Sequence, residues 1–396
     1  MNIIINFLVY SICIFSSLSA FAESAFSLKS QGTSITISTN LNNTYHDAGI
    51  KILSSGHSFS SCTTNSEGYC SFTVSNKSSA VIGITSNSRS TLKVLLCLSA
   101  AYPTNWFSQS VTVGPVKSNI AYLTNAHGQG LNTVQICDIS SSGMTISNCQ
   151  STGANFDNPY SIAIHPQNVS AYITNSFDNT LSRCSLNSAG QLIDCSKISS
   201  NFNRPLGVKV SSSPYLVYFA AGDDNKIIKC TTQSDGSILG CSSSGSYLDL
   251  PTDIALNTSL TRIYVTNYST SKVTTCNLDP SGDLYGCQYT GSNFSNPTGI
   301  TINSTGNRVY ILNGQSQLVT VCTIANSGLL TGCTTTGSGL MDPKSIVINK
   351  SGTQAFITNT TADRISRCII SSTGHFANCS TAASNIENVS GLALVE

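Results

Sequence analysis

Twelve of the sixteen cysteines form six pairs of nearly constant spacing, and such pairs are candidates for disulfide or metal chemistry. The members of each pair lie eleven or twelve residues apart, on either side of a turn. The six pairs are Cys137 with Cys149, Cys184 with Cys195, Cys230 with Cys241, Cys276 with Cys287, Cys322 with Cys333, and Cys368 with Cys379. They contain no C-x-x-C motif and have no histidine at zinc-binding spacing. Six equivalent pairs are also typical of structural cross-links rather than of redox sites, so we expect six disulfides.

A seventh pair, Cys62 and Cys70, brackets the turn-forming segment 65–68, and we expect a disulfide there too. Cys97 is then left over in the apolar run 94–98. A thiol in such a run is more often a buried, inert side chain than a reactive one.

No other motif predicts a catalytic or metal centre. The five histidines neither repeat nor cluster, and they are His46, His57, His127, His165 and His375. The chain has no G-x-S-x-G elbow, no H-E-x-x-H helix motif and no phosphate-binding loop. The scattered aspartates could together bind Ca²⁺, which is the alternative, but the chain has no D-x-D-x-D-G calcium-binding loop. We therefore expect no cofactor.

A repeat of 46 residues organises most of the chain and must position these side chains. Short apolar runs begin at Ser161, Gly207, Asp253, Gly299, Ser345 and Gly391. A proline precedes each of the first five runs by two residues. In the unit that begins at Gly299, the stretches 299–303, 308–312, 318–324 and 329–335 have strand character, separated by turn signals. Four strands in a repeat of this length are typical of a β-propeller, while solenoid repeats carry fewer strands.

The second strand of each repeat carries a recurring motif. It is clearest as Tyr122-Leu123-Thr124-Asn125, Tyr172-Ile173-Thr174-Asn175, Tyr264-Val265-Thr266-Asn267 and Phe356-Ile357-Thr358-Asn359. Over about 280 residues this pattern resembles the YVTN repeat family, which is close to the NHL-type propellers. The resemblance implies the fold, and it implies two enzymatic alternatives, because such propellers include lactone hydrolases and lyases. No residue of this chain matches an active site of either kind.

The strand count predicts six blades. The chain has six first strands and six second strands, and the last first strand, 391–395, has no partner after it. We expect this strand to pair with the second strand at Tyr122 and so close the ring, which removes an exposed sheet edge. A seven-bladed ring is the alternative, because 110–113 also has the character of a first strand.

In a propeller, ligands bind at the mouth of the central channel, on the face formed by two sets of loops. One set joins each fourth strand to the next first strand, and the other joins second to third strands. Residues that break the repeat there are the best candidates for a binding site. The selected residues are Tyr160, Arg204, Asp223, Asp224, Asp253, Tyr268, Lys344 and Arg364, with Asp178, Asp342 and Asp363 as further departures.

The N-terminal part of the chain lacks the repeat. Residues 1–22 have the pattern of a secretory signal peptide with cleavage after Ala22. Residues 23–100 alternate in polarity and weakly resemble a bacterial Ig-like module, so we expect a small β-sandwich before a propeller at 101–396.

The composition narrows the functions that we expect. Charged residues make up 9% of the chain and its net charge is +1, so it has no basic surface to bind nucleic acid. No later stretch is apolar enough for stable membrane insertion. We expect a monomeric protein, secreted or periplasmic, that binds a protein or glycan partner at the channel mouth without catalysis. A lactone hydrolase or a lyase is the alternative.

Overall fold

The computed structural model describes residues 117–126, 132–166, 168–187, 189–198, 202–212, 214–233 and 236–396, and the backbone of eight strands between residues 26 and 113. The predicted signal peptide, Cys62 and His127 lie outside these residues, so the leader and the disulfide between Cys62 and Cys70 stay predictions. The chain divides into two units, Met1–Val116 with Asn187–Ala189, and Lys117–Leu186 with Gly190–Glu396.

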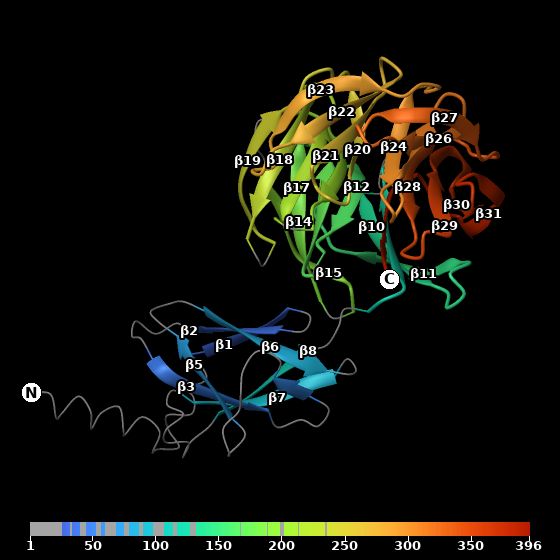
Figure 1. Cartoon of the computed structure of the whole chain (residues 1–396). Coiled ribbons are helices and arrows are strands. Elements are labelled where there is room, and N and C mark those ends of the chain that lie inside the picture. Colours follow the sequence, from blue (N-terminus) through green and yellow to red (C-terminus); the bar gives the residue numbers. More distant parts are fainter. Residues whose placement is uncertain are drawn as a thin grey trace, which may run out of the picture. The chain divides into compact units, whose positions relative to one another are not determined.

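The second unit is a ring of six blades, each a four-stranded antiparallel sheet (Figure 1). Five blades use four consecutive strands, in the order β12-β13-β14-β15 and its repeats through β28-β29-β30-β31. The first strands are β12 (Pro159–Ile164), β16 (Pro205–Val210), β20 (Pro251–Leu256), β24 (Pro297–Ile302) and β28 (Pro343–Ile348). The second strands are β13 (Ser170–Asn175), β17 (Leu216–Ala221), β21 (Arg262–Asn267), β25 (Arg308–Asn313) and β29 (Gln354–Asn359).

The third and fourth strands complete these five blades. The third strands are β14 (Thr180–Leu186), β18 (Lys226–Thr232), β22 (Lys272–Leu278), β26 (Leu318–Ile324) and β30 (Arg364–Ile370). The fourth are β15 (Leu192–Ile198), β19 (Ile238–Ser244), β23 (Leu284–Thr290), β27 (Leu330–Thr336) and β31 (Phe376–Ser384). A 3-10 turn, η2 (Thr360–Ala362), follows β29. In the described residues, no helix is both long and apolar enough to cross a membrane.

The sixth blade closes the ring as the sequence predicts. It has the order β11 (Ile146–Thr152), β10 (Thr133–Ile139), β9 (Ile120–Asn125) and β32 (Val389–Val395). The C-terminal strand β32 pairs antiparallel with β9, with Ala393 opposite Tyr122 and Val395 opposite Ile120. The two ends of the ring therefore share one sheet, and the inner edge of β9 is paired rather than open.

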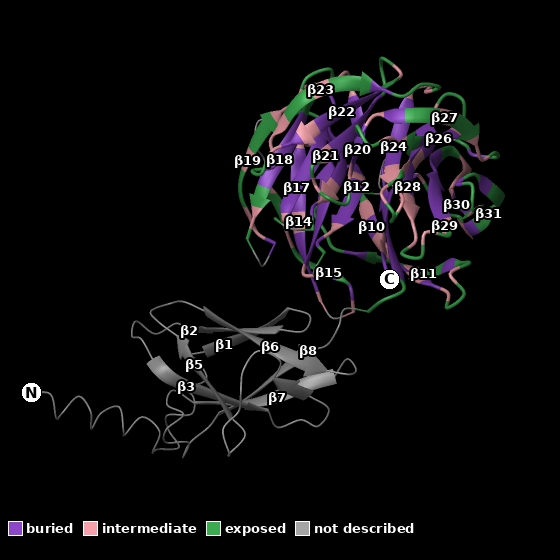
Figure 2. Cartoon of the chain, in the orientation of Figure 1, coloured by how far each residue is buried: buried purple, intermediate pink, exposed green. Residues whose placement is uncertain are grey.

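Burial decreases from the inner strands to the outer strands of each blade (Figure 2). Every residue of β9, β13 and β17 is buried, while β23 and β27 expose most of their residues. The tyrosines of the YVTN-like motif are among the largest fully buried side chains. Four of them also link neighbouring blades: the hydroxyl of Tyr264, for example, donates to the Gly328 carbonyl at 2.8 Å. The equivalent pairs are Tyr122–Gly190, Tyr172–Gly236 and Tyr218–Gly282.

The threonine and asparagine of the motif are structural as well. The Thr266 hydroxyl accepts from the Asp253 N–H at 3.0 Å within its blade. The buried Asn267 side chain accepts from the Asp249 N–H at 3.0 Å and donates to Thr274 at 2.8 Å. Asn267 therefore holds the loop that enters the blade, which is the turn-stabilising role that asparagine favours.

The six predicted disulfides of the ring are all present, and each joins the third and fourth strands of one blade. The pairs are Cys137 with Cys149, Cys184 with Cys195, Cys230 with Cys241, Cys276 with Cys287, Cys322 with Cys333, and Cys368 with Cys379. Six disulfides indicate an oxidising environment.

The two cysteines of each disulfide differ in burial. The third-strand member is fully buried in every blade, at 1% exposure or less. The fourth-strand member lies on the outer strand of the blade and is only half-buried, and these residues are Cys149, Cys195, Cys241, Cys287, Cys333 and Cys379. Each disulfide therefore ties an outer strand, which has little buried surface of its own, to the packed interior of its blade.

The N-terminal unit contains two four-stranded sheets. One has the order β1 (Phe26–Gln31), β2 (Ser34–Thr39), β6 (Ser79–Ser86) and β4 (His57–Phe59). The other has the order β5 (Tyr69–Val74), β3 (Tyr45–Ile52), β7 (Ser90–Cys97) and β8 (Phe107–Val113). Strand β8 contains 110–113 and pairs with β7, from Ser90 opposite Val113 to Leu96 opposite Phe107. This segment is therefore not a blade strand, and the seven-bladed alternative is wrong. The Ig-like character of the unit stays a prediction.

Candidate functional site

The loops that enter the first strands and the turns between second and third strands lie on one face of the ring, because the four strands of each blade alternate in direction. We call this the mouth face. The residue just before each first strand has a positive φ, between 46° and 52°. These six residues are Asn158, Arg204, Leu250, Asn296, Asp342 and Asn388. Asparagine and aspartate tolerate this conformation well, whereas Arg204 and Leu250 adopt it at a cost.

Arg204 projects its side chain at the mouth face. Its carbonyl accepts from the Gly222 N–H at 3.0 Å, which fixes the backbone of the loop. Its guanidinium lies 3.4 Å from the Asp223 carboxylate, and about half of each side chain is exposed, 49% for Arg204 and 53% for Asp223. Among the described residues, Asp223 is the one side chain that the guanidinium contacts, so most of its five N–H donors can bind a partner.

A hollow of about 350 Å³ lies around Arg204. We call it the mouth hollow. It is lined by Asn158, Tyr160, Ser176, Phe177, Asn179, Arg204, Leu206 and Asp223. Phe177, in the turn between β13 and β14, is 70% exposed, the largest exposed fraction among the exposed large hydrophobic side chains of the described residues. Three of the eight residues selected from the sequence, Tyr160, Arg204 and Asp223, therefore meet in one hollow.

Tyr160 lies within electrostatic reach of several charged groups of the mouth face. Burial raises the pKa of its phenol above the usual range, and the Asp253 carboxylate raises it further, while Arg204 lowers it. Asp342 and Tyr268 add smaller upward contributions to the same pKa. These groups thus lie within electrostatic reach of one hydroxyl.

Asp253 is the one deeply buried carboxylate of the channel wall among the described residues. Its side chain is 6% exposed, and its Oδ2 accepts from the Ile300 N–H of the next blade at 3.0 Å. Its Oδ1 lies 3.5 Å from Lys209 Nζ of the preceding blade. A Cβ added to Gly207 would come within 2.2 Å of this Oδ1, so the carboxylate occupies the space that glycine leaves. Burial raises the pKa of Asp253, against the opposing effect of the Lys209 cation.

Lys209 is a site residue that its place in the sequence does not single out. It lies inside the first strand β16, where no loop draws attention to it. A comparison of the repeats nevertheless shows that Lys209 is unusual. The positions that correspond to Lys209 in the other blades hold small or apolar residues, namely Ala163, Ala255, Thr301, Val347 and Ala393. A lysine at this register breaks the repeat as clearly as Asp253 does.

The other predicted residues are held by local contacts. Lys344 pairs with Asp342 at 2.7 Å near the channel, and Tyr268 is 37% exposed with its carbonyl accepting from Asn296. Asp224 accepts from the backbone and side chain of Asn203 at 2.6 and 2.7 Å.

Two further departures from the repeat also support loops. Arg364 donates to the Gly339 carbonyl at 2.6 Å. Asp363 accepts from the Asn388 N–H at 2.9 Å. These side chains stabilise the loops of the mouth face, and neither lines the mouth hollow.

The described histidines lie away from the mouth hollow. His165 is buried in a turn between first and second strands and packs on Tyr215 with ring centroids 4.4 Å apart. Burial, and then the Arg183 cation, lowers its pKa. His375 lies in a turn between third and fourth strands and contacts Thr334. In the described part of the chain, no three His, Cys, Asp or Glu side chains gather where they could hold a metal ion.

No protein-family model and no curated protein matches the chain. Solved structures match it as a fold, with structural neighbours of propeller type. A chain of a nidogen/laminin complex has a TM-score of 0.56 at 11% identity and covers 69% of this chain and 97% of its own. The periplasmic gluconolactonase of Pseudomonas aeruginosa has a TM-score of 0.52 at 12% identity, over 66% of this chain and 83% of its own.

A third neighbour covers more of the chain. A putative 6-phosphogluconolactonase from Bacteroides fragilis has a TM-score of 0.52 at 11% identity, over 89% of this chain and 98% of its own. Identities this low show a shared fold alone.

Proposed function

We propose that this chain is an exported, monomeric, non-catalytic β-propeller that binds a protein partner at the mouth hollow. The observation that carries the proposal is the pairing of Phe177, 70% exposed, with the half-exposed Arg204 at the rim of one hollow. Aromatic residues and arginine dominate the binding energy of protein interfaces, in contrast to lysine and glutamate. Tyr268 and Met341, 37% and 44% exposed, extend the same type of surface on this face.

Two further observations support a protein partner and export. The nidogen/laminin neighbour is a propeller-type fold found in a protein complex, which favours a protein over a glycan as partner. Six disulfides agree with export after removal of 1–22.

The experiment compares partner capture by matched variants of the full mature chain. Wild-type protein, Phe177→Ala, Arg204→Ala and the control Leu239→Ala are immobilised and exposed to extracellular proteins of the producing cells and to a glycan array. Leu239 is 63% exposed on the outer strand β19, away from the mouth hollow. The proposal predicts a protein retained by wild type and by Leu239→Ala but lost with both mouth variants. Retention by all four proteins, or retention of glycans alone, would contradict it.

Lactone hydrolysis is the second candidate function. The specific observation in its favour is the buried Asp253 with a raised pKa beside Lys209, because perturbed carboxyls beside a charged partner are candidate acids or bases. Gluconolactone hydrolysis that wild type performs and Asp253→Asn does not would replace the binding proposal. An elimination reaction that wild type catalyses and Asp253→Asn does not would instead indicate a lyase.

A further inference from the structure

A second hollow, of about 300 Å³, opens on the face opposite the mouth face. It lies between the blade β16–β19 and the blade β20–β23, and we call it the inter-blade hollow. Turns between first and second strands and one turn between third and fourth strands form it. Its lining residues are Ser211, Pro214, Leu216, Tyr218, Ser259, Leu260, Thr261, Leu278, Asp279, Pro280 and Gly282.

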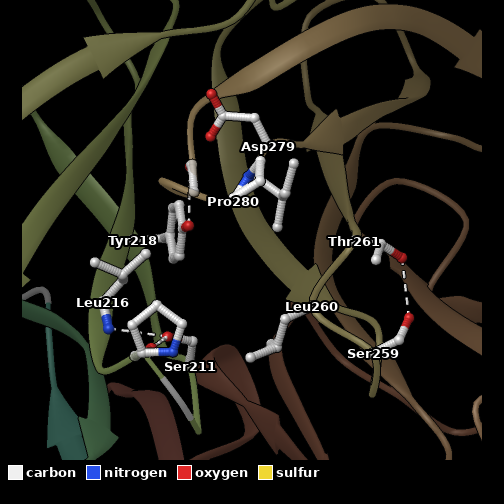
Figure 3. Close-up of a pocket in the computed structure, with 11 residues that line it drawn as sticks. Ser211, Leu216, Tyr218, Ser259, Leu260, Thr261, Asp279 and Pro280 are labelled. Carbon is white, nitrogen blue, oxygen red and sulfur yellow. Dashed lines mark hydrogen bonds between the residues drawn. The ribbon is translucent and has the colours of Figure 1, made fainter.

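The walls of this hollow are apolar. Figure 3 shows Leu216 and Tyr218 on one side, Leu260 facing the gap from the other, and Pro280 with Asp279 at one end. The Tyr218 hydroxyl donates to the Gly282 carbonyl at 2.9 Å, so its ring is fixed as part of the wall. The hydroxyl groups of Ser259 and Thr261 form a hydrogen bond of 2.9 Å with each other. Leu260, which lies between them in the sequence, lines the hollow.

Three of the apolar wall residues break the repeat at this place. Leu260 has a φ of 52°, a conformation that the next two blades assign to Gly306 and Gly352 at the same position. A bulky residue there is a backbone outlier, and outliers of this kind are enriched at functional sites. Pro214 occupies the same position in the preceding blade. Pro280 occupies a turn position that the next blades fill with Asn326 and Ser372.

The rim of the inter-blade hollow is acidic. Two carboxylates lie in the turn between β22 and β23, and Asp283 is neutralised by Lys229 at 2.6 Å. Asp279 has no ion-pair partner among the described residues, and its Oδ1 accepts from the N–H groups of Ser281 and Asp283 at 2.9 and 2.8 Å. Both carboxylates raise the pKa of Tyr218, after the larger effect of burial, so both lie within electrostatic reach of the wall.

We propose that the inter-blade hollow binds a peptide segment of a partner protein that inserts one aliphatic side chain and places a lysine or arginine against Asp279. The volume is at the lower limit of ligand pockets, which suits one anchoring side chain better than a cofactor. Asp279 forms no ion pair among the described residues, although the Lys229 cation lies within electrostatic reach of it, and its carboxylate favours a cationic neighbour for that anchor. The surface lies on the opposite face from the mouth hollow, so this proposal is independent of the proposed function.

The test titrates the full mature chain, with labelled leucine methyl groups, against three capped dipeptides and follows the methyl resonances by NMR. The probes are N-acetyl-Leu-Lys-amide, N-acetyl-Ala-Lys-amide and N-acetyl-Leu-Glu-amide. We expect the first to shift the methyl resonances of Leu216, Leu260 and Leu278. The alanine probe should bind about tenfold more weakly because most of the apolar anchor is missing. The glutamate probe should bind about threefold more weakly, in a salt-dependent way.

Variants keep this test independent of folding. Leu260→Gly installs the residue of the next two blades and relieves the positive φ, so the ring should fold while affinity for the first probe falls about tenfold. Asp279→Asn should reduce the difference between the lysine and glutamate probes. Met144→Ala is the control, because Met144 lies in the turn between β10 and β11, which corresponds in another blade to the turn that holds Asp279. It should leave the affinities for all three probes unchanged.

Several results would overturn the proposal. It fails if the first probe shifts none of these leucine methyls, or if Leu260→Gly folds and binds the probe as wild type does. It also fails if the alanine probe binds as tightly as the leucine probe. If the glutamate probe binds as tightly as the lysine probe or more tightly, the proposal that a lysine or arginine of the partner lies against Asp279 is wrong.

Discussion

Asp253 occupies a position that holds serine or glycine in the other five blades, and burial raises the pKa of its carboxyl. A native pKa above the unfolded value means that the folded chain binds this proton more tightly than the unfolded chain does. The contribution of Asp253 therefore favours the folded state at low pH and is lost as pH rises from the unfolded pKa of about 3.9 through the native value.

Because the contribution of Asp253 to stability is lost as pH rises, wild type and Asp253→Asn should differ in how their stability depends on pH. The melting temperature of wild type should fall relative to that of Asp253→Asn as pH rises through the native pKa of Asp253. Asp279→Asn is the matched control of opposite sign: hydrogen bonds, first from Ser281, lower the pKa of Asp279, so its contribution is lost as pH falls. Calorimetry at a series of pH values checks both. A difference between wild type and Asp253→Asn that does not vary with pH would refute the account of Asp253.

The hydrogen bond from the Tyr264 hydroxyl to the Gly328 carbonyl links two neighbouring blades. Tyr264→Phe should lower the free energy of unfolding by about 1–2 kcal/mol, because a buried carbonyl loses its donor. Tyr285→Phe, on a side chain that is 57% exposed, is the control and should change stability by less than about 0.5 kcal/mol. Urea unfolding of the two variants measures the difference. Equal stabilities would mean that this bond does not link the blades.

The sequence predicts the site where a departure from the repeat lies in a loop or at the strand end next to it, as Tyr160 does at the start of β12. Arg204 and Asp223 were identified in this way, and they meet in the mouth hollow. Asp224 and Arg364 were equally unusual in sequence, yet their side chains bond loop backbones, a difference that only three-dimensional contacts reveal. Lys209 was overlooked because it lies within a strand and reaches its partner Asp253 across the boundary between two blades.

At the scale of elements, each blade is a four-stranded sheet whose outer hairpin is closed by a disulfide. Spacing around a turn was enough to predict the six pairs, because residues equally distant from a hairpin turn face each other. The strand lengths and the pairing of β32 with β9 follow from the same repeat. The inter-blade hollow was not predictable, since Pro214, Leu260 and Pro280 meet there from three separate turns.

Removing one disulfide should weaken a single blade without unfolding the ring. The double variant Cys322→Ala with Cys333→Ala should lose up to about 3 kcal/mol of unfolding free energy, the value that chain entropy assigns to a loop of this length. The blade should still form, because β26 and β27 keep their backbone ladder. Urea unfolding without reductant gives the loss, and peptide mapping of the wild type gives the control for pairing. Free thiols at both positions in the wild type would contradict the disulfide.

At the scale of the whole molecule, the ring depends on the pairing of its two ends. Deleting 389–396 removes β32 and exposes the edge of β9. An unpaired edge is a template for pairing with another chain, so we expect dimers or larger species and faster amide exchange in Ile120–Asn125. Light scattering and hydrogen exchange measure these effects. Deleting Glu396 alone is the control and should leave a monomer. If the chain that lacks 389–396 is monomeric and the amides of β9 remain protected from exchange, pairing with β32 is not needed to close the ring.

Binding of a protein partner at the mouth hollow is tested most directly by a photo-crosslinking amino acid placed at Phe177 of the full mature chain. The same group at Leu239 on β19 reports on non-specific contact. After irradiation with extracellular proteins of the producing cells, we predict one defined protein adduct at position 177, reduced at least about tenfold by Arg204→Ala and missing at position 239. The same adducts at both positions, or no protein adduct at position 177, would contradict the proposed function.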